Sequence, residues 1–204
     1  ELHQETLRAD LFLASDGPRQ RAELPTVFLG SRGAFNFDLK VVLRQGGHHS
    51  GNWGGLLRNP GVRLAHAIAS MVDERGAIRV AGLRPPPLTA GVRKALASLQ
   101  FAGDAGDPEI DPDWGEPGLS PGERVIGWNA LEVLAFKTGN PEAPVNAIPG
   151  QATCHAQIRF VVGSDSGRFV EHLRRHLDDH GFADVEVVAS GPCMEASRLD
   201  PEDA

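Results

Sequence analysis

The stretch QATCHAQIRFVV, residues 151–162, decides the fold because apolar and polar residues alternate along it. Successive side chains of a β-strand point to opposite faces of a sheet, so this pattern predicts a strand with one buried face. The opposite face would be polar and would carry Thr153, His155 and Arg159. The residues expected on the buried face are Ala152, Cys154, Ala156, Ile158, Phe160 and Val162.

Working outward from this strand, three further segments show apolar residues at strand-like spacing. Residues 35–44 alternate as cleanly as 151–162. Two shorter apolar runs come before and after 151–162 in the chain. The predicted strands are 35–44, 131–138, 151–162 and 184–189, with a possible short one at 77–80.

Two segments predict amphipathic helices. Asn59-Pro60 is typical of an N-cap followed by a first-turn proline, and we expect the helix that follows to end at Gly76. Residues 164–166 can cap a second helix, which would end at Gly181. The order strand, helix, strand, strand, helix, strand predicts an α+β fold. It is the ferredoxin-like β-α-β-β-α-β sandwich, an antiparallel sheet with helices on one face.

Residues 82–127 interrupt this order. The segment holds seven prolines together with several glycines and many acidic residues. Such a composition favours a long loop or insertion over regular structure, with a short helix expected within 89–100.

The overall composition excludes several classes of protein. In 204 residues, 41% are hydrophobic and 23% charged, which favours a packed core over disorder. The net charge of −7 argues against a general nucleic-acid binder, and we expect no nucleic-acid partner. No apolar run approaches the roughly 20 residues of a membrane span, so no membrane partner is expected. Two cysteines, Cys154 and Cys193, cannot form a disulfide framework, which favours a cytoplasmic location.

The loop GGHHSGNWGG, residues 46–55, is the most unusual stretch of the chain. Glycines let a backbone turn sharply and approach a ligand closely, and two histidines and a tryptophan lie among them. The loop taken alone fits a binding element and a plain glycine-rich connection equally well.

A series of short motifs, taken in order, resembles the lid or dimerisation domain of the M20 family of zinc metallopeptidases. The series covers about residues 10–200, and the insertion 82–127 is the part that it matches least. That family includes dipeptidases, carboxypeptidases and deacylases of amino-acid biosynthesis. The motifs are Gly30-Ser31-Arg32-Gly33, His49-Ser50-Gly51, Trp53-Gly54-Gly55, Asn59-Pro60, Val145-Asn146-Ala147-Ile148-Pro149 and Ile158-Arg159-Phe160.

The resemblance implies roles for four residues. His49 would reach into the other subunit's active site and stabilise the substrate carbonyl as negative charge develops there. Asn146 and Arg159 would bind the substrate carboxylate, and Asp16 would be a zinc ligand. The alternatives are an ordinary surface ion pair for Arg159 and a turn role for Asp16. Because residues 49 and 159 would serve one reaction, we expect them on related surfaces.

The resemblance also implies an organisation into parts. Residues 30–190 would be the lid, and 1–29 and 191–204 short segments of a metal-binding catalytic domain. The parent enzyme would hold two zinc ions, pair as a homodimer through lid edge strands, and cleave dipeptides or N-acyl amino acids. This chain has no Glu-Glu pair, and its one His-x-Asp, at 176–178, falls in a predicted helix. We therefore expect the 204 residues alone to bind no zinc and to be inactive. A free-standing ferredoxin-like regulatory or small-ligand-binding module is the alternative.

Overall fold

The computed structural model describes residues 5–6, 8–10, 28–99, 101 and 106–201. The predicted zinc ligand Asp16 and its Ser-Asp-Gly segment lie outside the described residues. Within the described part, no helix is both long and apolar enough to pass through a lipid bilayer.

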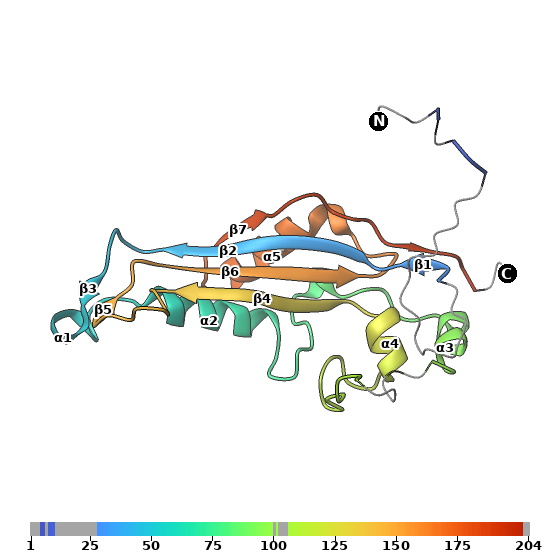
Figure 1. Cartoon of the computed structure of the whole chain (residues 1–204), viewed down its shortest axis with the longest axis horizontal. Coiled ribbons are helices and arrows are strands. Elements are labelled where there is room, and N and C mark those ends of the chain that lie inside the picture. Colours follow the sequence, from blue (N-terminus) through green and yellow to red (C-terminus); the bar gives the residue numbers. More distant parts are fainter. Residues whose placement is uncertain (1–4, 7, 11–27, 100, 102–105, 202–204) are drawn as a thin grey trace.

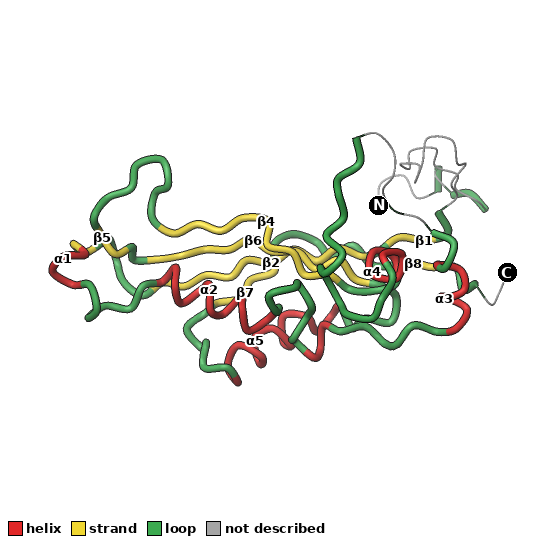
Figure 2. The backbone as a smooth tube through the Cα atoms, turned by 90° about the horizontal axis from the view of Figure 1, so that it is seen from below, coloured by secondary structure: helices red, strands yellow, loops and turns green. Residues whose placement is uncertain are grey.

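The body of the domain is a four-stranded antiparallel sheet covered on one face by two helices, as Figures 1 and 2 show. The strand order is β4-β6-β2-β7, which confirms the predicted ferredoxin-like β-α-β-β-α-β sandwich. The elements are β2 (Gly33–Val42), α2 (Pro60–Met71), β4 (Ala130–Thr138), β6 (Gln151–Phe160), α5 (Phe169–Asp179) and β7 (Glu186–Ala189).

The core lies between the sheet and the helices. The even-numbered residues of β6 from Ala152 to Phe160 are all buried, as their alternation predicts. Phe35 and Phe160 both pack edge-on against Phe169 of α5, with ring centroids 5.7 and 5.2 Å away. The other face of the sheet carries the polar residues of β2 and β6 and has no helical cover (Figure 2).

The start of α2 follows the sequence prediction, but its end does not. The side-chain oxygen of Asn59 accepts hydrogen bonds from the backbone N–H groups of Gly61 (2.9 Å) and Val62 (3.3 Å). The helix ends at Met71, so the prediction that Gly76 ends it is wrong. The carboxylate of Asp73 accepts from the backbone of the residues that follow and closes a separate turn there.

The predicted cap of the second long helix is also wrong. A short 3-10 turn, η2 (Ser166–Arg168), precedes α5, and no side chain caps either element. The hydroxyl of Ser164 bonds the buried Asn129 instead, and that of Ser166 bonds Glu195. Residues 77–80 do not form a strand, since Ile78 makes only a single bridge with Val72.

The insertion 82–127 has more structure than its composition predicts. It begins within η1 (Ala81–Leu83) and contains α3 (Ala90–Leu96), which confirms the predicted short helix, and α4 (Pro121–Ile126). A capping box between Ser120 and Glu123 starts α4. The insertion lies against one end of the sheet (Figure 1).

Two small β-ribbons extend the sheet at opposite ends (Figure 1). At one end β3 (His48–His49) pairs with β5 (Ala147–Ile148), and α1 (Ser50–Trp53) follows β3 directly. We call β3, α1 and β5 the arm. At the other end β1 (Gly30–Ser31) pairs with β8 (Ser197–Arg198), which brings two segments far apart in the sequence side by side.

Candidate functional site

His49 lies at the tip of the arm, where β3 passes into α1. Its Nδ1 accepts a hydrogen bond of 3.1 Å from the backbone N–H of Gly51, so the ring caps the first turn of α1. A neutral imidazole that accepts at Nδ1 carries its proton at Nε2. The local fold therefore fixes the ring and leaves an N–H donor at Nε2, on a side chain that is exposed to solvent.

Asn146 adjoins His49 through the same ribbon. Its backbone oxygen accepts hydrogen bonds from the N–H (2.9 Å) and the hydroxyl (3.2 Å) of Ser50, the residue that follows His49. The side-chain amide of Asn146 makes no hydrogen bond to any residue that the structure describes. The structure thus brings an imidazole and an amide together at the tip of the arm.

Arg159 lies at the far end of β6, on the open face of the sheet. Its neighbours across the sheet are Ala34 on β2 and Ala130 on β4, and both side chains are too short to cover the guanidinium. Arg159 forms no ion pair with any described carboxylate, so the alternative of an ordinary surface ion pair is not what the structure shows. The buried Asn129 holds this corner together, since it bonds Leu83 and Val161 at 2.8 Å each.

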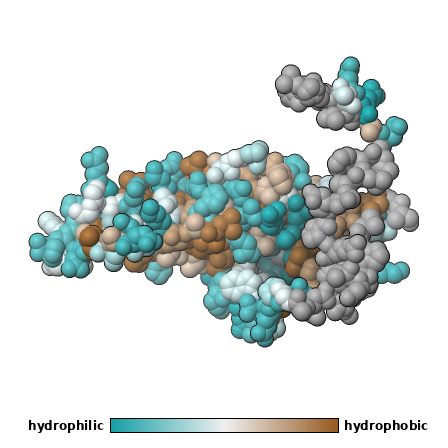
Figure 3. Space-filling view, in the orientation of Figure 1, coloured by the Kyte–Doolittle hydropathy of each residue, from teal (hydrophilic) through white to brown (hydrophobic). Residues whose placement is uncertain are grey.

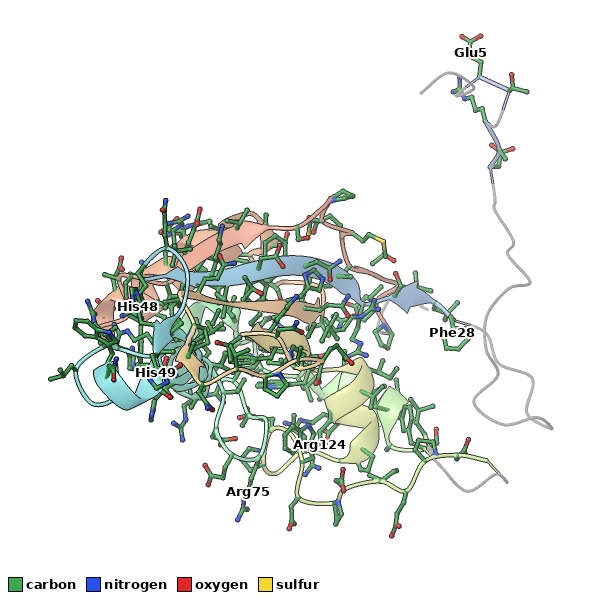
Figure 4. All side chains as sticks on the ribbon, turned by 60° about the vertical axis from the view of Figure 1, so that its left-hand side comes forward. Glu5, Phe28, His48, His49, Arg75 and Arg124 are labelled. Carbon is green, nitrogen blue, oxygen red and sulfur yellow. The ribbon has the colours of Figure 1, made fainter. Side chains whose placement is uncertain are left out.

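The expectation that residues 49 and 159 lie on related surfaces is wrong. Figure 4 shows His48 and His49 at one end of the molecule and Phe28, which lines the same cavity as Arg159, at the other. The eight residue-to-residue steps from Gln151 to Arg159 alone span about 26 Å of extended strand. Asn146, predicted to act with Arg159, lies with His49 instead. One copy of this chain therefore cannot present His49 and Arg159 to the same small molecule.

Sequence reasoning named Arg32 only as part of a motif and assigned it no role. Arg32 lies beside Arg159 in a cavity on the open face, which Glu132 and Gln157 also line. Burial, followed by the nearby positive charge of Arg159, lowers the pKa of Arg32. Burial raises the pKa of Glu132. Asn36, Asp38 and Lys40 are the polar positions of the first long strand. The same alternation continued back to residue 32 would have placed Arg32 on this face.

The described residues do not provide a metal site. No group of three or more histidine, cysteine, aspartate or glutamate side chains that could hold an ion occurs among residues 28–99, 101 and 106–201 or the short described segments before them. The His176–His180 pair is structural here. The rings stack at 4.0 Å, His176 Nε2 donates to the backbone oxygen of Ser70, and His180 Nδ1 to that of His176.

The described residues thus form a ferredoxin-like sandwich with an arm that presents His49 at one end and an open sheet face that carries Arg159. Comparison with known families shows what kind of domain this is. The family model of the peptidase dimerisation domain, M20_dimer, matches residues 29–185. The chain belongs to this M20 dimerisation domain family.

Similar proteins are M20 peptidases. The chain is 34% identical over 186 residues to Beta-Ala-His dipeptidase of Homo sapiens, covering 83% of this chain and 34% of the relative. It is 28% identical over 154 residues to Cysteinylglycine-S-conjugate dipeptidase of Corynebacterium striatum, covering 70% of this chain and 33% of the relative. The chain therefore spans about a third of the length of these relatives.

Solved structures agree on the fold. Human carnosine dipeptidase 1 superposes with a TM-score of 0.65 at 22% identity, over 86% of this chain and 39% of that one. An M20 family metallo-carboxypeptidase from Sulfolobus solfataricus gives the same TM-score and identity, over 79% of this chain and 38% of that one.

Proposed function

We propose that this chain acts as the lid and homodimerisation domain of an M20 metallohydrolase that cleaves the amide bond of dipeptides or N-acyl amino acids. The family match supports the domain's role, and the dipeptidase relatives support the substrate class. The single observation that carries the mechanism is the separation of His49 from Arg159. Two groups that serve one substrate but lie at opposite ends of a domain can meet only if two copies of the domain share each site.

The exposed edge of β4 is the surface best suited to pairing. Nine residues long, β4 has the free edge of the sheet on its outer side, because only β6 pairs with it. Val133, Leu134 and Phe136 on this strand are 44%, 55% and 43% exposed. Figure 3 shows apolar surface over the part of the molecule where Figure 1 places β4. A long apolar edge strand left unpaired invites strand addition from another chain.

Helix α2 lies beside that edge. Gly61 packs against Thr138 at the end of β4, so closely that a side chain at Gly61 would meet its methyl group. Ala65 lies one turn after Gly61 and is exposed, whereas Ile68 further along is partly buried against the core. The opposite edge strand, β7, has only four residues and offers far less to a partner. We therefore place the homodimer interface at β4 and α2.

Pairing of two copies about a two-fold axis would bring the arm of one subunit over the open sheet face of the other. His49 would then donate its Nε2 proton to the oxygen that becomes negative during attack on the amide, at a site where the partner's own lid supplies Arg159. Asn146 would act with His49 as a second donor in the shared site, because the ribbon holds the two together. Arg159 alone would hold the substrate carboxylate.

The remaining parts of the active site would come from a catalytic domain joined to this one, which residues 1–29 and 191–204 would enter. The pairing of β1 with β8 supports this, because it brings the segments before and after the sandwich to one place. The two zinc ions implied by the family resemblance would be held there, with Asp16 as one ligand. The free-standing regulatory module is less favoured, because the similar proteins named above are peptidases.

Sedimentation equilibrium of the 204-residue chain tests the pairing. A homodimer gives twice the chain's 21.8 kDa, and the mass should fall toward that of the monomer on dilution. A mass of 21.8 kDa that does not change up to the millimolar range would contradict the proposal, because pairing would then contribute too little to assemble a shared site.

A further inference from the structure

A large cavity lies between the end of β6 and the insertion, and one side of it is aromatic. Its volume is about 1200 Å³. We call its aromatic and apolar side the aromatic wall, formed by Phe28, Phe101, Trp114, Ile126 and Trp128. Trp114 and Phe28 are about half exposed, at 53% and 51%. A single chain therefore leaves a wide apolar surface open to solvent, which is typical of a place where another body binds.

The fold holds the aromatic wall in place. The guanidinium of Arg124 on α4 (Figure 4) donates to the backbone oxygens of Pro112 (2.9 Å) and Trp114 (2.6 Å). Gly76 lies directly against the indole of Trp114, where a side chain would collide with the ring. The wall is therefore preformed, and a partner that binds it need not spend free energy on ordering it.

The lining of the cavity is acidic as well as aromatic. Its charged side chains are five carboxylates against three arginines, namely Asp107, Glu109, Asp111, Glu116 and Glu132 against Arg32, Arg124 and Arg159. The insertion is the source of this excess, because residues 106–118 contain five acidic residues and no lysine, arginine or histidine. Glu116 is paired with Arg84, but Glu109 and Asp111 form no ion pair with any described residue. Such a lining favours an apolar body that carries positive charge.

The arm and the turn after it expose large apolar side chains at the opposite end of the molecule. Trp53 is 45% exposed, and Leu56 and Val145 are both 77% exposed. The turn is ordered, since the N–H of Leu56 donates to the backbone oxygen of Trp53 at 3.1 Å. The indole of Trp53 also lies edge-on to the ring of His48, with centroids 6.3 Å apart. These side chains form a fixed apolar surface that the single chain leaves uncovered.

The arm also has the opposite charge to the cavity. Residues 44–58 contain two arginines and two histidines and no acidic residue, and the return segment 139–150 adds only Glu142. The side chain of Arg58 is 73% exposed and lies 3.6 Å from Asp184. The guanidinium of Arg44 bonds backbone oxygens and forms no ion pair with a described carboxylate. The arm thus combines the apolar character and the positive charge that the cavity lining favours.

The proposed pairing at β4 brings these two surfaces together. The strand begins at Ala130, which lines the cavity, and ends at Thr138, on the side of the arm (Figure 1). When two copies of a strand pair antiparallel about a two-fold axis, the start of each lies beside the end of the other. Figures 1 and 2 both show the insertion projecting past β4 on the side away from β6, where the paired copy would lie.

We propose that the aromatic wall is the docking surface for the arm of a second copy of this chain. The exposed apolar side chains of the arm pack on the wall, and Arg58 faces the acidic residues of the insertion. The inference rests on the proposed function and adds to it a second dimer contact, separate from the β4 edge. The insertion is then the element that holds the partner's arm, and with it the histidine that serves the shared site.

Sedimentation equilibrium of variants of the 204-residue chain tests the apolar part of this contact. Leu56→Asp removes an apolar side chain and brings a negative charge to the acidic lining. Each dimer contains the contact twice, so we expect the dimer to weaken about 100-fold. Val188→Asp is the matched control, because Val188 is an exposed aliphatic residue on β7, at the opposite edge of the sheet. It should leave the dissociation constant unchanged, and circular dichroism verifies that both variants are folded.

A charge exchange tests the polar part. Glu109→Lys and Arg58→Glu should each weaken the dimer about tenfold at about 50 mM salt, where exposed charges are weakly screened. The double variant exchanges the two signs and should recover most of this loss. Two substitutions that merely damage the fold would not rescue each other, so the recovery is specific to charges that face one another across the interface.

Three results would overturn the inference, and only one of them also removes the proposed function. If the chain dimerises and Leu56→Asp and Glu109→Lys pair as tightly as the unchanged chain, the arm does not dock on the wall. The wall is then covered by another body, such as an adjoining domain or an apolar ligand. If the double variant is as weak as the two single losses added together, the charges do not face each other and the docking is wrong. If the unchanged chain stays a monomer up to the millimolar range, the homodimer and the docked arm both fail.

Discussion

Replacing Phe136 with lysine should break the proposed homodimer without unfolding the domain. The side chain lies on the outer edge strand β4 and is 43% exposed in the single chain. A charged group there faces its own copy across a two-fold axis, and lysine on an edge strand is a common natural device against pairing. The domain itself should stay folded, because the core beneath this strand consists of other residues.

The size of the effect follows from the exposed area. A phenylalanine side chain offers about 200 Å², so 43% leaves about 85 Å² for a partner to cover. Two copies bury about 170 Å², and at about 25 cal/mol per Å² this contributes about 4 kcal/mol to pairing. Phe136→Lys should therefore weaken the dimer about 1000-fold, before any repulsion between the two lysines is counted.

Val188→Lys is the matched control. Val188 is also 43% exposed and also lies on an edge strand, but on β7 at the opposite side of the sheet. Sedimentation equilibrium of both variants, with circular dichroism to verify folding, gives the two dissociation constants. If Val188→Lys dissociates the dimer and Phe136→Lys does not, the interface lies at β7 and the assignment to β4 is wrong.

Three further outcomes are expected. The guanidinium of Arg63 holds the Asp184 carboxylate at 2.6 Å and lowers its pKa, so this stabilisation is complete above the unfolded-state pKa of about 3.9 and disappears as pH falls through the lowered pKa. Asp184→Asn should lower the free energy of unfolding, measured in urea, by about 1–2 kcal/mol at pH 7 and by almost nothing near pH 2. An equal loss at both pH values would refute the link between the charged Asp184 carboxylate and stability. Asn129→Ala should cost about 3 kcal/mol, because it leaves the N–H of Val161 and the oxygen of Leu83 buried without a partner, and a loss below about 1 kcal/mol would contradict this. The 204-residue chain with added zinc or cobalt should not hydrolyse dipeptides, and measured turnover would disprove that.

Local sequence signals predict the sandwich well. Strict alternation in residues 151–160 fixes both the strand and its buried face, and it requires no knowledge of distant residues. The prediction is wrong at its end, because β6 stops at Phe160 and Val162 is 39% exposed. The Asn59-Pro60 cap is equally local, since the side chain bonds the backbone two and three residues ahead. The prediction placed the end of α2 too late, because the Asp73 carboxylate accepts hydrogen bonds from the backbone ahead of it and forms a separate turn that contains Gly76.

Features that depend on distant contacts could not be predicted from the sequence. Ser164 and Ser166 have the right chemistry for a cap, but Asn129 and Glu195 compete successfully for their hydroxyls. The ribbon that joins Asn146 to His49 pairs segments about 100 residues apart. The cavity depends in the same way on an insertion whose composition predicts a loop.

Complementation between two inactive variants tests the shared site most directly. The proposed M20 enzyme that would contain this domain would be prepared as His49→Ala and as Arg159→Gln, each expected to be nearly inactive, and the two would be mixed and allowed to exchange subunits. If His49 serves the partner's site and Arg159 its own, each mixed dimer regains one intact site, and an equal mixture recovers about a quarter of wild-type activity. If both residues act within one subunit, every site keeps one defect and no activity returns, which would contradict a site shared between subunits.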